Sequence, residues 1–342
     1  MLSIKPIGSS SQEVSYYASL GVDYYVSGEE PPGEWWGSGA KALGLDGAVD
    51  PIAFRNLLEG FHADGQEKLV QNAGRGDRRA AFDLTWSLVK SSSALWSQCD
   101  ETDRNKLENA ATKSLFRTLA VFDDLCGVTR RGSQGERVEK AGLIAAVFKH
   151  ETSRGVPGVA PDPNIHFHVV VANAVVREDG TTGAFDARPL FQRNMKMALG
   201  AMFRAEFCKE LMSLGLETYR PLRANGQKAS WFELRAIPPR LIDAFSKRRR
   251  AIEKWLSVNG QSGAKAAELA AKKTRRKKER FTHSQLFSSW LETARGLGIN
   301  RSNLPKLFRS HRNIDEPTAA DAAVQEALQR IMKSQSHFDP LP

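Results

Sequence analysis

Apolar and polar residues alternate along residues 81–87, as they do in a half-buried strand. An aromatic or aliphatic side chain stands at every second position from Phe82, and polar side chains stand between them, among them Asp83. Because side chains alternate between the two faces of a strand, one face of this strand is predicted to be buried and the other polar. The predicted polar face therefore carries a carboxylate.

The clearest alternating stretch covers residues 164–176. Ile165 begins its apolar face, and His166 and His168 lie together on the opposite face. Another predicted strand, residues 142–150, ends at His150. Three of the seven histidines of the chain therefore fall in one short region of the predicted sheet.

Helical patterns occupy the segments around these strands. Residues 103–124 have apolar side chains at intervals of three or four, and residues 193–214 are predicted as a long helix that ends at Gly215. Residues 28–47 are rich in Gly, Pro and Trp and predict a structured loop that leads to a helix. Residues 216–234 predict a β-hairpin, with its turn at the Ala-Asn-Gly sequence of residues 224–226.

Positive charge is concentrated near the C-terminal end of the chain. The sequence has 49 Lys and Arg against 39 Asp and Glu, a net charge of +10. Residues 247–280, predicted to be helical, hold thirteen Lys and Arg and three Glu, an excess as large as that of the whole chain. Such a concentrated positive field indicates a polyanionic partner, most often nucleic acid. A solubilising linker or a membrane-surface segment can give a similar run.

Length and composition predict a protein with a sizeable core and no membrane anchor. A chain of 342 residues is long enough for two domains. No apolar run approaches the roughly 20 residues of a membrane span, and the first eight residues lack the pattern of a secretory leader. Cys99, Cys126 and Cys208 are scattered and cannot all pair, so we expect reduced thiols in a cytoplasmic protein.

The three histidines form a candidate metal site. His166 and His168 stand two residues apart on a predicted strand, so both side chains point to one face and can bind a single ion. His150 would supply a third imidazole. For an isolated His-x-His pair, the alternative is two hydrogen-bonded histidines on a sheet face without a ligand. Three imidazoles suit Mn, Fe, Co, Ni or Zn better than Mg, which prefers oxygen ligands.

Tyrosines are clustered near the N-terminus. Four of the five tyrosines of the chain form the pairs Tyr16-Tyr17 and Tyr24-Tyr25 in a stretch without Phe, which suggests that the phenolic oxygens are needed. A tyrosine can attack a phosphodiester and conserve the energy of the broken bond in a phosphotyrosine. With a pKa near 10, only about one tyrosine in a thousand is ionised at pH 7, so the attack needs assistance.

Two nearby groups could supply this assistance. A metal ion can act as a Lewis acid on the scissile phosphate. Asp83 could orient a ligand histidine or take the tyrosine proton. The alternative for Asp83 is a plain carboxylate at the edge of a strand.

The order of these motifs resembles the conjugative relaxases of the TraI/TrwC type, which are tyrosine HUH endonucleases. The matching stretches are MLS, SYYASLGVDYYVSG, EWWGSGAKALGLDGAVD, FDLTWSLVKSSS, FKHETSRG, PNIHFHVVVANAVV and AFSKRRRAIEKW, in this order over about residues 1–300. The resemblance implies an α+β fold, with an antiparallel β-sheet palm flanked by helices and with C-terminal helical fingers. It implies a palm in residues 1–237, basic fingers in residues 238–310 and a tail in residues 311–342.

The resemblance also implies roles for individual residues. Tyr16 would attack the phosphate at the nic site of a transfer origin and leave a 5′-phosphotyrosine and a free 3′-hydroxyl. Tyr24 would serve a second transfer, with Tyr17 and Tyr25 in support. The metal ligands would be His150, His166 and His168, with Asp83 beside them. The residues expected to contact DNA are Arg79, Lys90, Arg154, Lys247, Arg248, Arg249, Arg250, Arg275, Arg276, Lys277 and Lys278.

Cofactor and partners follow from the same resemblance. The family works with Mg or Mn, so we expect one such divalent ion, while Zn, Ni or Co should also bind. The implied partners are single-stranded transfer-origin DNA, accessory transfer proteins and a coupling protein in the bacterial cytoplasm. The sequence DLTWSLVKS replaces the usual DLTFSAPKS, and residues 80–81 replace the usual Pro-Gly, which leaves the DNA sequence preference open.

Three other functions are compatible with parts of these patterns. A rolling-circle replication initiator uses the same chemistry, but it typically places its tyrosine after the His-x-His strand, whereas both tyrosine pairs come first here. A non-catalytic single-stranded-DNA-binding module could retain the fold. A histidine-metal enzyme acting on small molecules would retain the metal site but would not bind single-stranded DNA.

Overall fold

The central element of the protein is an antiparallel β-sheet. The computed structural model describes residues 2–8, 32–155, 158–223, 225–274, 281–300 and 304. The main sheet order is β1 (Leu2–Gly8), β3 (Arg79–Ser87), β6 (Pro163–Arg177), β5 (Arg137–Thr152) and β2 (Glu34–Trp36). In addition, β4 (Val128–Arg131) pairs with β5, and β7 (Thr182–Gly183) pairs with β6. All these pairs are antiparallel, so the predicted α+β fold with an antiparallel sheet is confirmed.

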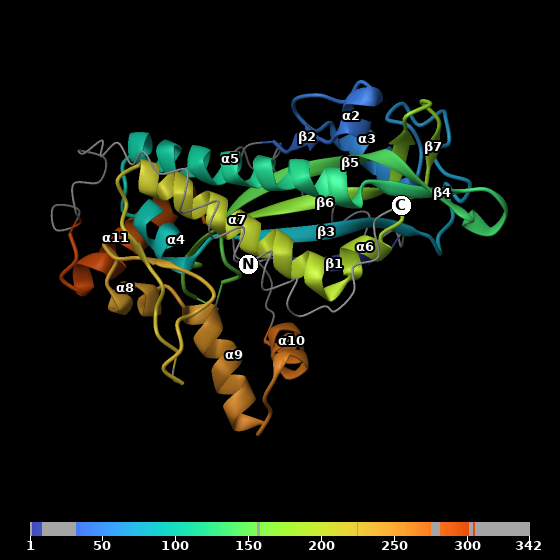
Figure 1. The fold of residues 1–342 in the computed structure, drawn as a ribbon. Helices are drawn as coiled ribbons and strands as arrows, with labels where there is room; N and C mark the ends of the chain where they lie inside the picture. Colours follow the sequence, from blue (N-terminus) through green and yellow to red (C-terminus); the bar gives the residue numbers. More distant parts are fainter. Residues whose placement is uncertain are drawn as a thin grey trace.

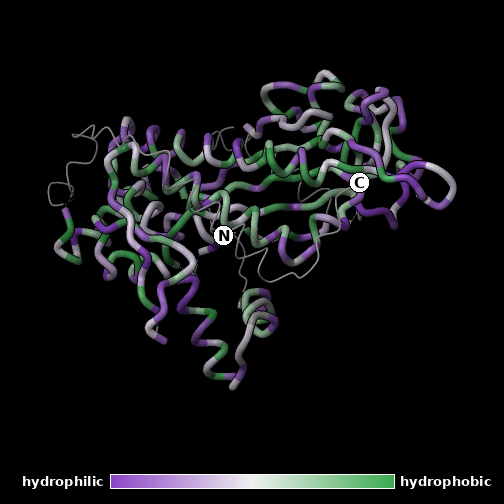
Figure 2. Tube along the Cα trace, viewed as in Figure 1, coloured by the Kyte–Doolittle hydropathy of each residue, from purple (hydrophilic) through white to green (hydrophobic). Residues whose placement is uncertain are grey.

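Helices cover both faces of this sheet (Figure 1). On one face lie α5 (Glu101–Cys126) and α7 (Arg193–Ser213), and the opposite face carries α2 (Ser38–Ala42) and α3 (Pro51–Glu59). Strand β5 shows the division between the two cores, because Leu143 packs on the α5 side and Ile144 on the α3 side. The buried strands are largely green in Figure 2, in agreement with a sheet that is apolar on both faces.

The predicted long elements are present, and β3, β5, β6 and α5 extend beyond their predicted bounds. Strand β5 begins five residues before the predicted start at residue 142, and α5 extends the helix predicted for residues 103–124 at both ends. Asp100 begins α5, since its side chain accepts a hydrogen bond from the backbone of Asp103. Gly215 ends the segment after α7 with a φ of 79°, a conformation that favours glycine.

The prediction of a loop for residues 28–47 was wrong for part of this segment. Strand β2 and helix α2 lie within it. Gly39 explains why the helix fits there, because a Cβ at this position would collide with the carbonyl oxygen of Gly142 on β5. The glycine that suggests a loop in the sequence instead permits a short helix to pack closely against the sheet.

The C-terminal part contains the predicted hairpin and a group of helices. The hairpin pairs β8 (Thr218–Tyr219) with β9 (Glu233–Leu234). It is followed by α8 (Pro239–Ala244), α9 (Lys247–Val258), α10 (Ala264–Lys273) and α11 (His283–Gly296). Leu241 of α8 and Trp290 of α11 belong to the core that α5 and α7 cover. Helices α9 and α10 project away from the sheet, and α9 is largely purple in Figure 2.

Two predictions from composition can be compared with the described residues. Among these residues, no helix is long and apolar enough to cross a membrane. Cys99, Cys126 and Cys208 are free cysteines. The division of the chain at residue 237 stays a prediction.

Candidate metal and nucleic-acid site

Three histidines meet where β5 and β6 run side by side. His150 of β5 is the register partner of His166 on β6, and His168 follows two residues later on the same face of β6. Their ring centroids are 5.2 Å apart for His150 and His166, 5.1 Å for His150 and His168, and 5.2 Å for His166 and His168. The structure thus brings together all three residues of the predicted metal site.

Hydrogen bonds at Nδ1 fix the orientation of two of these rings. Nδ1 of His168 lies 2.9 Å from each carboxylate oxygen of Asp83. Nδ1 of His166 lies 2.8 Å from the backbone carbonyl oxygen of Asn164, and since a carbonyl can only accept, this nitrogen donates. In both rings Nε2 is then the nitrogen that can bind a metal ion, an arrangement that often accompanies histidine ligands.

The spacing of the rings agrees with a metal-binding role. Imidazoles bound to one ion at about 2.1 Å in tetrahedral directions have their ring centroids about 5 Å apart. Within the described ranges, no group of three or more His, Cys, Asp or Glu side chains is arranged so that it could hold a metal ion as the side chains lie. The imidazole donors and the distances between their centroids are the features that support a divalent ion at these histidines.

Asp83 is positioned by its strand and by a neighbouring hydroxyl. It is 4% exposed, and Oγ1 of Thr85 donates to its carboxylate over 3.3 Å. Thr85 is also the register partner of His168, which places the carboxylate of Asp83 beneath the imidazole. Of the two roles predicted for Asp83, this geometry supports the orientation of a histidine.

The end of β5 is anchored on the face opposite to His150. Lys149 forms an ion pair with Glu108 of α5 and another, of 3.2 Å, with Glu151. Burial alone would lower the pKa of Lys149, but the two carboxylates outweigh it and raise the pKa. Glu151 also lies 3.3 Å from Nε2 of His283, the first residue of α11. The backbone on both sides of His150 is therefore held by neighbouring helices.

The segment that leads into β6 is anchored by three helices. Nε1 of Trp290 on α11 donates to the carbonyl of Pro161 at 2.8 Å. Nζ of Lys247 on α9 pairs with Asp162 at 3.1 Å. Nζ of Lys90 on α4 (Lys90–Trp96) donates to the carbonyl of Pro163 at 2.7 Å. Asp162 also accepts a hydrogen bond from the backbone nitrogen of Lys247 at 2.7 Å. We call residues 161–163 the junction; it ends three residues before His166. The contacts of Asp162 with Lys247 therefore connect the first residue of the projecting helix α9 to the strand that carries His166.

Two of the basic residues predicted to lie near the active site have other positions. Burial lowers the pKa of Lys90 to about 8 despite the attraction of Asp162, and its amine is bound to a carbonyl within the protein. Arg79 begins β3 six residues before Thr85, so it lies about 20 Å along the strand from the register of His168. Arg79 is therefore not presented at the histidines, and the amine of Lys90 is used by a contact within the protein. The sequence did not reveal which end of a strand, or which side of a helix, faces the site. Arg154 is partly exposed four residues after His150.

The four consecutive basic residues of α9 have different environments. Arg248 donates to the carbonyls of Thr274 and Ala271 at 2.9 Å and 2.6 Å, and thereby joins α9 to α10. Arg250 donates to the carbonyl of Asp243. Arg249 has a side chain that is 75% exposed and pairs only with Glu253 among the contacts of the described residues. The fold thus uses Arg248 to join two helices and leaves Arg249 exposed, and the DNA contacts predicted for all four residues stay predictions.

Other predicted site residues lie outside the described residues. These are Tyr16, Tyr17, Tyr24, Tyr25, Arg275, Arg276, Lys277 and Lys278. Their predicted roles stay predictions.

Sequence reasoning missed one basic residue on the histidine face. Lys5 of β1 is the register partner of Asp83, and it is exposed. Leu2 packs in the core of the α5 side, so Lys5, three positions later, faces the side of the histidines. The alternation of residues 2–7 contained this information, but the pairing of β1 with β3 was needed to interpret it.

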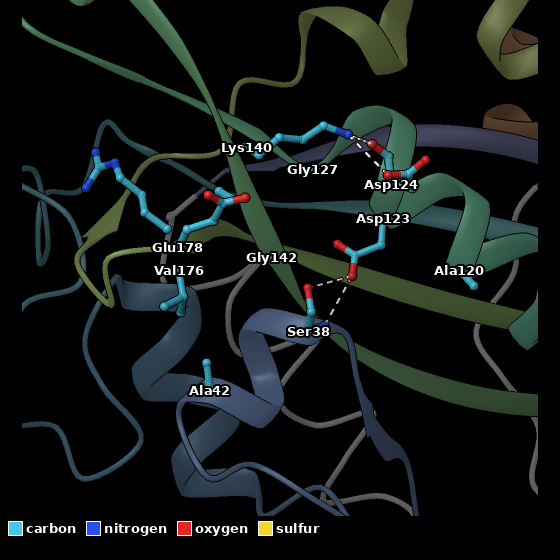
Figure 3. Close-up of a pocket in the computed structure, with 12 residues that line it drawn as sticks. Ser38, Ala42, Ala120, Asp123, Asp124, Gly127, Lys140, Gly142, Val176 and Glu178 are labelled. Carbon is cyan, nitrogen blue, oxygen red and sulfur yellow. Dashed lines mark hydrogen bonds and ion pairs between the residues drawn. The ribbon is translucent and has the colours of Figure 1, made fainter.

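A separate cavity lies at the other end of the sheet (Figure 3). It has a volume of about 440 Å³ and lies between the end of α5, the start of β5 and α2. Two of its three acidic residues have structural partners: Asp123 accepts from the Ser38 hydroxyl at 2.7 Å, and Asp124 pairs with Lys140 at 3.2 Å. Gly142, which lines this cavity, precedes His150 by eight residues on β5, or about 26 Å. This cavity is therefore distinct from the histidine site.

The sheet carries one histidine on a strand, a His-x-His pair on the next strand and a carboxylate beside them, which is the arrangement that the resemblance implied for the palm of a relaxase. The chain belongs to the TrwC relaxase family, whose family model matches residues 10–297. The prediction of a TraI/TrwC-type conjugative relaxase is thereby confirmed.

Relatives and solved structures agree with this membership. The chain is 30% identical over 308 residues to the multifunctional conjugation protein TraI of Escherichia coli. This match covers 88% of the chain but 16% of TraI. Among solved structures, a metal-bound complex of conjugative relaxase TrwC with oriT DNA is 29% identical with a TM-score of 0.74, and covers 88% of this chain and 100% of that one. TrwC bound to a 27-mer with the recognition hairpin and cleavage site has a TM-score of 0.73 at 29% identity, with the same coverage.

Proposed function

We propose that this protein is a DNA relaxase that nicks one strand of transfer-origin DNA for conjugative transfer. The observation that carries the proposal is the histidine triad, with ring centroids 5.1–5.2 Å apart and with Asp83 bound to His168. This arrangement stands in a chain of the relaxase family, and TrwC of that family binds oriT DNA.

The proposed reaction is a transesterification. The Oη of Tyr16 forms a bond to the scissile phosphorus while the bond from phosphorus to the 3′-oxygen breaks. The phenol loses its proton, the leaving 3′-oxygen gains one, and a 5′-phosphotyrosine and a 3′-hydroxyl result. Tyr24 would perform a second transfer, with Tyr17 and Tyr25 in support.

The described residues supply the fixed part of this site. His150, His166 and His168 would hold one divalent ion, which acts as a Lewis acid on the phosphate when bound. Asp83 keeps the ring of His168 in place and favours Nδ1 protonation. Lys5, on the same face, would attract the phosphate group by its charge.

The cofactor and the wider partners are also proposals. We infer that Mg or Mn supports catalysis and that Zn, Ni or Co can also bind, because imidazoles accept all of these ions while phosphate and water supply oxygen ligands. Accessory transfer proteins and a coupling protein are proposed partners in the bacterial cytoplasm, since the similar TraI is a conjugation protein of a bacterium.

A covalent adduct provides the test. The protein is incubated with labelled single-stranded oligonucleotides that tile the transfer origin of its own replicon, with Mg or Mn, and the products are separated under denaturing conditions. We expect a protein–DNA adduct and a shortened product with a free 3′-hydroxyl, both lost in Tyr16→Phe. Binding without an adduct at any oligonucleotide would instead indicate a non-catalytic module, and no binding of single strands would exclude both functions.

A further inference from the structure

The hairpin of residues 216–235 exposes aromatic and basic side chains together. Trp231 is 41% exposed and Leu222 is 70% exposed. The guanidinium of Arg223 lies over the ring of Trp231, 5.4 Å from its centroid, and Arg235 lies at the same distance over Tyr219. An exposed indole with a cation beside it is the combination that binds a stacked base and its phosphate.

The hairpin is ordered by its own hydrogen bonds. The backbone of Arg223 donates to Gln227 at 2.8 Å, and the backbone of Ala229 donates to Pro221 at 2.7 Å. Arg220 holds the carbonyl of Ala229 through its Nε at 2.6 Å. Trp231 therefore stands on a fixed scaffold, which reduces the entropy lost when a base stacks on it.

The base of the hairpin lies next to the junction that leads into the histidine strand. Glu233 accepts from the backbone of Ser91 at 3.0 Å, and the backbone of Leu234 donates to the Ser91 hydroxyl at 2.9 Å. The adjacent residue Lys90 is the one that binds the carbonyl of Pro163. The hairpin, gold in Figure 1 between α7 and α8, and helix α9 leave the body of the protein on the same side.

We infer that this hairpin is a contact surface for single-stranded DNA, with a base stacked on Trp231 and a phosphate bound by Arg223. The inference rests on the proposed function, since the strand that it binds is the one that enters the histidine site. Single-stranded DNA is favoured over a protein partner because the exposed Trp231 and the partly exposed Tyr219 each lie beside a guanidinium. It is favoured over a duplex because a paired base does not offer its face to an indole.

The test measures the affinity of the full chain for a 25-mer of dT labelled at one end, by fluorescence anisotropy. Trp231→Ala should weaken binding about 5- to 100-fold, the range of lost base stacking. Trp231→Phe, which keeps an aromatic face, should stay within about threefold of the unchanged protein. Ile52→Ala, which removes another exposed apolar side chain, 71% exposed on α3, is the matched control and should not change the affinity.

A second variant and a second ligand keep the outcomes distinct. Arg223→Gln should weaken binding and lower the dependence on salt, with Trp231 still in place. Equal affinities of Trp231→Ala and Ile52→Ala, or an equal loss for a 25-base-pair duplex and the single strand, would overturn the inference. Adduct formation is scored separately. If the unchanged protein forms the adduct but Trp231→Ala binds normally, only the inference about the hairpin is refuted. If Trp231→Ala binds more weakly but the unchanged protein forms no adduct, only the nicking proposal is refuted.

Discussion

Asp83 and His168 are joined across neighbouring strands by a hydrogen bond in which Nδ1 lies 2.9 Å from each carboxylate oxygen. The pair is set by the register of β3 and β6, which places Thr85 opposite His168 and Asp83 two residues away on the same face. A buried carboxylate behind a ligand histidine fixes the ring and raises its basicity. The sheet therefore supplies the orientation of the site before any substrate is bound.

Replacing this carboxylate tests its role. Asp83→Asn should lower the nicking rate or the affinity for Mn about 10- to 100-fold, because the amide no longer provides a negative charge at Nδ1. Calorimetric titration with Mn and the rate of adduct formation measure the two effects. Asp77→Asn is the matched control, since the side chain of Asp77 is 70% exposed and paired with Arg75 at the surface. If Asp83→Asn and Asp77→Asn had the same affinity for Mn and the same rate of adduct formation, Asp83 would have no role in metal binding or nicking.

Loss of one proposed ligand should separate catalysis from binding. His166→Ala should reduce adduct formation about a thousandfold or more, because a Lewis acid on phosphate contributes several kcal/mol. Affinity for the single strand should stay within about threefold, since basic residues away from the triad provide most of the attraction. Treatment of the unchanged protein with a chelator should reproduce the catalytic loss. His62→Ala, outside the triad, is the control, and full nicking by His166→Ala would contradict the metal role.

The sequence predicted those parts of the fold and site that depend on regular alternation. The strands with Asp83, His166 and His168 follow from a period of two and the strand with His150 from an apolar run, whereas the register that places His150 opposite His166 is known only from the structure. Membership of the relaxase family, predicted from the motif order, is confirmed. Local patterns carry this information because the polar side chains of the site stand out in strands that are otherwise largely apolar.

Features that depend on distant contacts could not be predicted. Gly39 belongs to a helix because its missing Cβ admits the backbone of β5, a reason that lies about a hundred residues away in the chain. Arg248 and Arg249 are indistinguishable as sequence, yet one joins two helices and the other is exposed. A run of basic residues predicts a charged region without showing which of its members are used by the fold.

Arg248 and Arg249 therefore form a matched pair for a third prediction. Arg249→Gln should weaken single-strand binding and reduce the salt slope by about 0.7, with little change in stability. Arg248→Gln should instead lower the free energy of unfolding by about 1–3 kcal/mol, since it loses hydrogen bonds from a charged group to α10. Urea unfolding and anisotropy titrations at several salt concentrations measure both. The same loss of stability in both variants would show that the structural distinction is wrong.

Lys90 gives the stability of the protein a pH dependence with a defined sign. Burial lowers its pKa to about 8 in the folded protein, whereas an unfolded lysine titrates near 10.4. Below pH 8 the amine is charged in both states, and the cost of burying the charge is fully present. Between about pH 8 and 10.4 the folded state loses its proton first, so the unfolded state binds more protons and this contribution to stability rises with pH.

Lys90→Met removes this titration. We expect the free energy of unfolding of the unchanged protein, minus that of Lys90→Met, to increase from pH 7.5 to pH 10 because the burial cost is progressively relieved. Urea unfolding at half-unit pH steps gives this difference, and it cancels the titration of all other groups. Lys68→Met, at an exposed lysine, is the matched control for the loss of a lysine side chain. A flat difference for Lys90→Met would mean that its amine is hydrated in the folded protein and does not anchor Pro163 as a buried group.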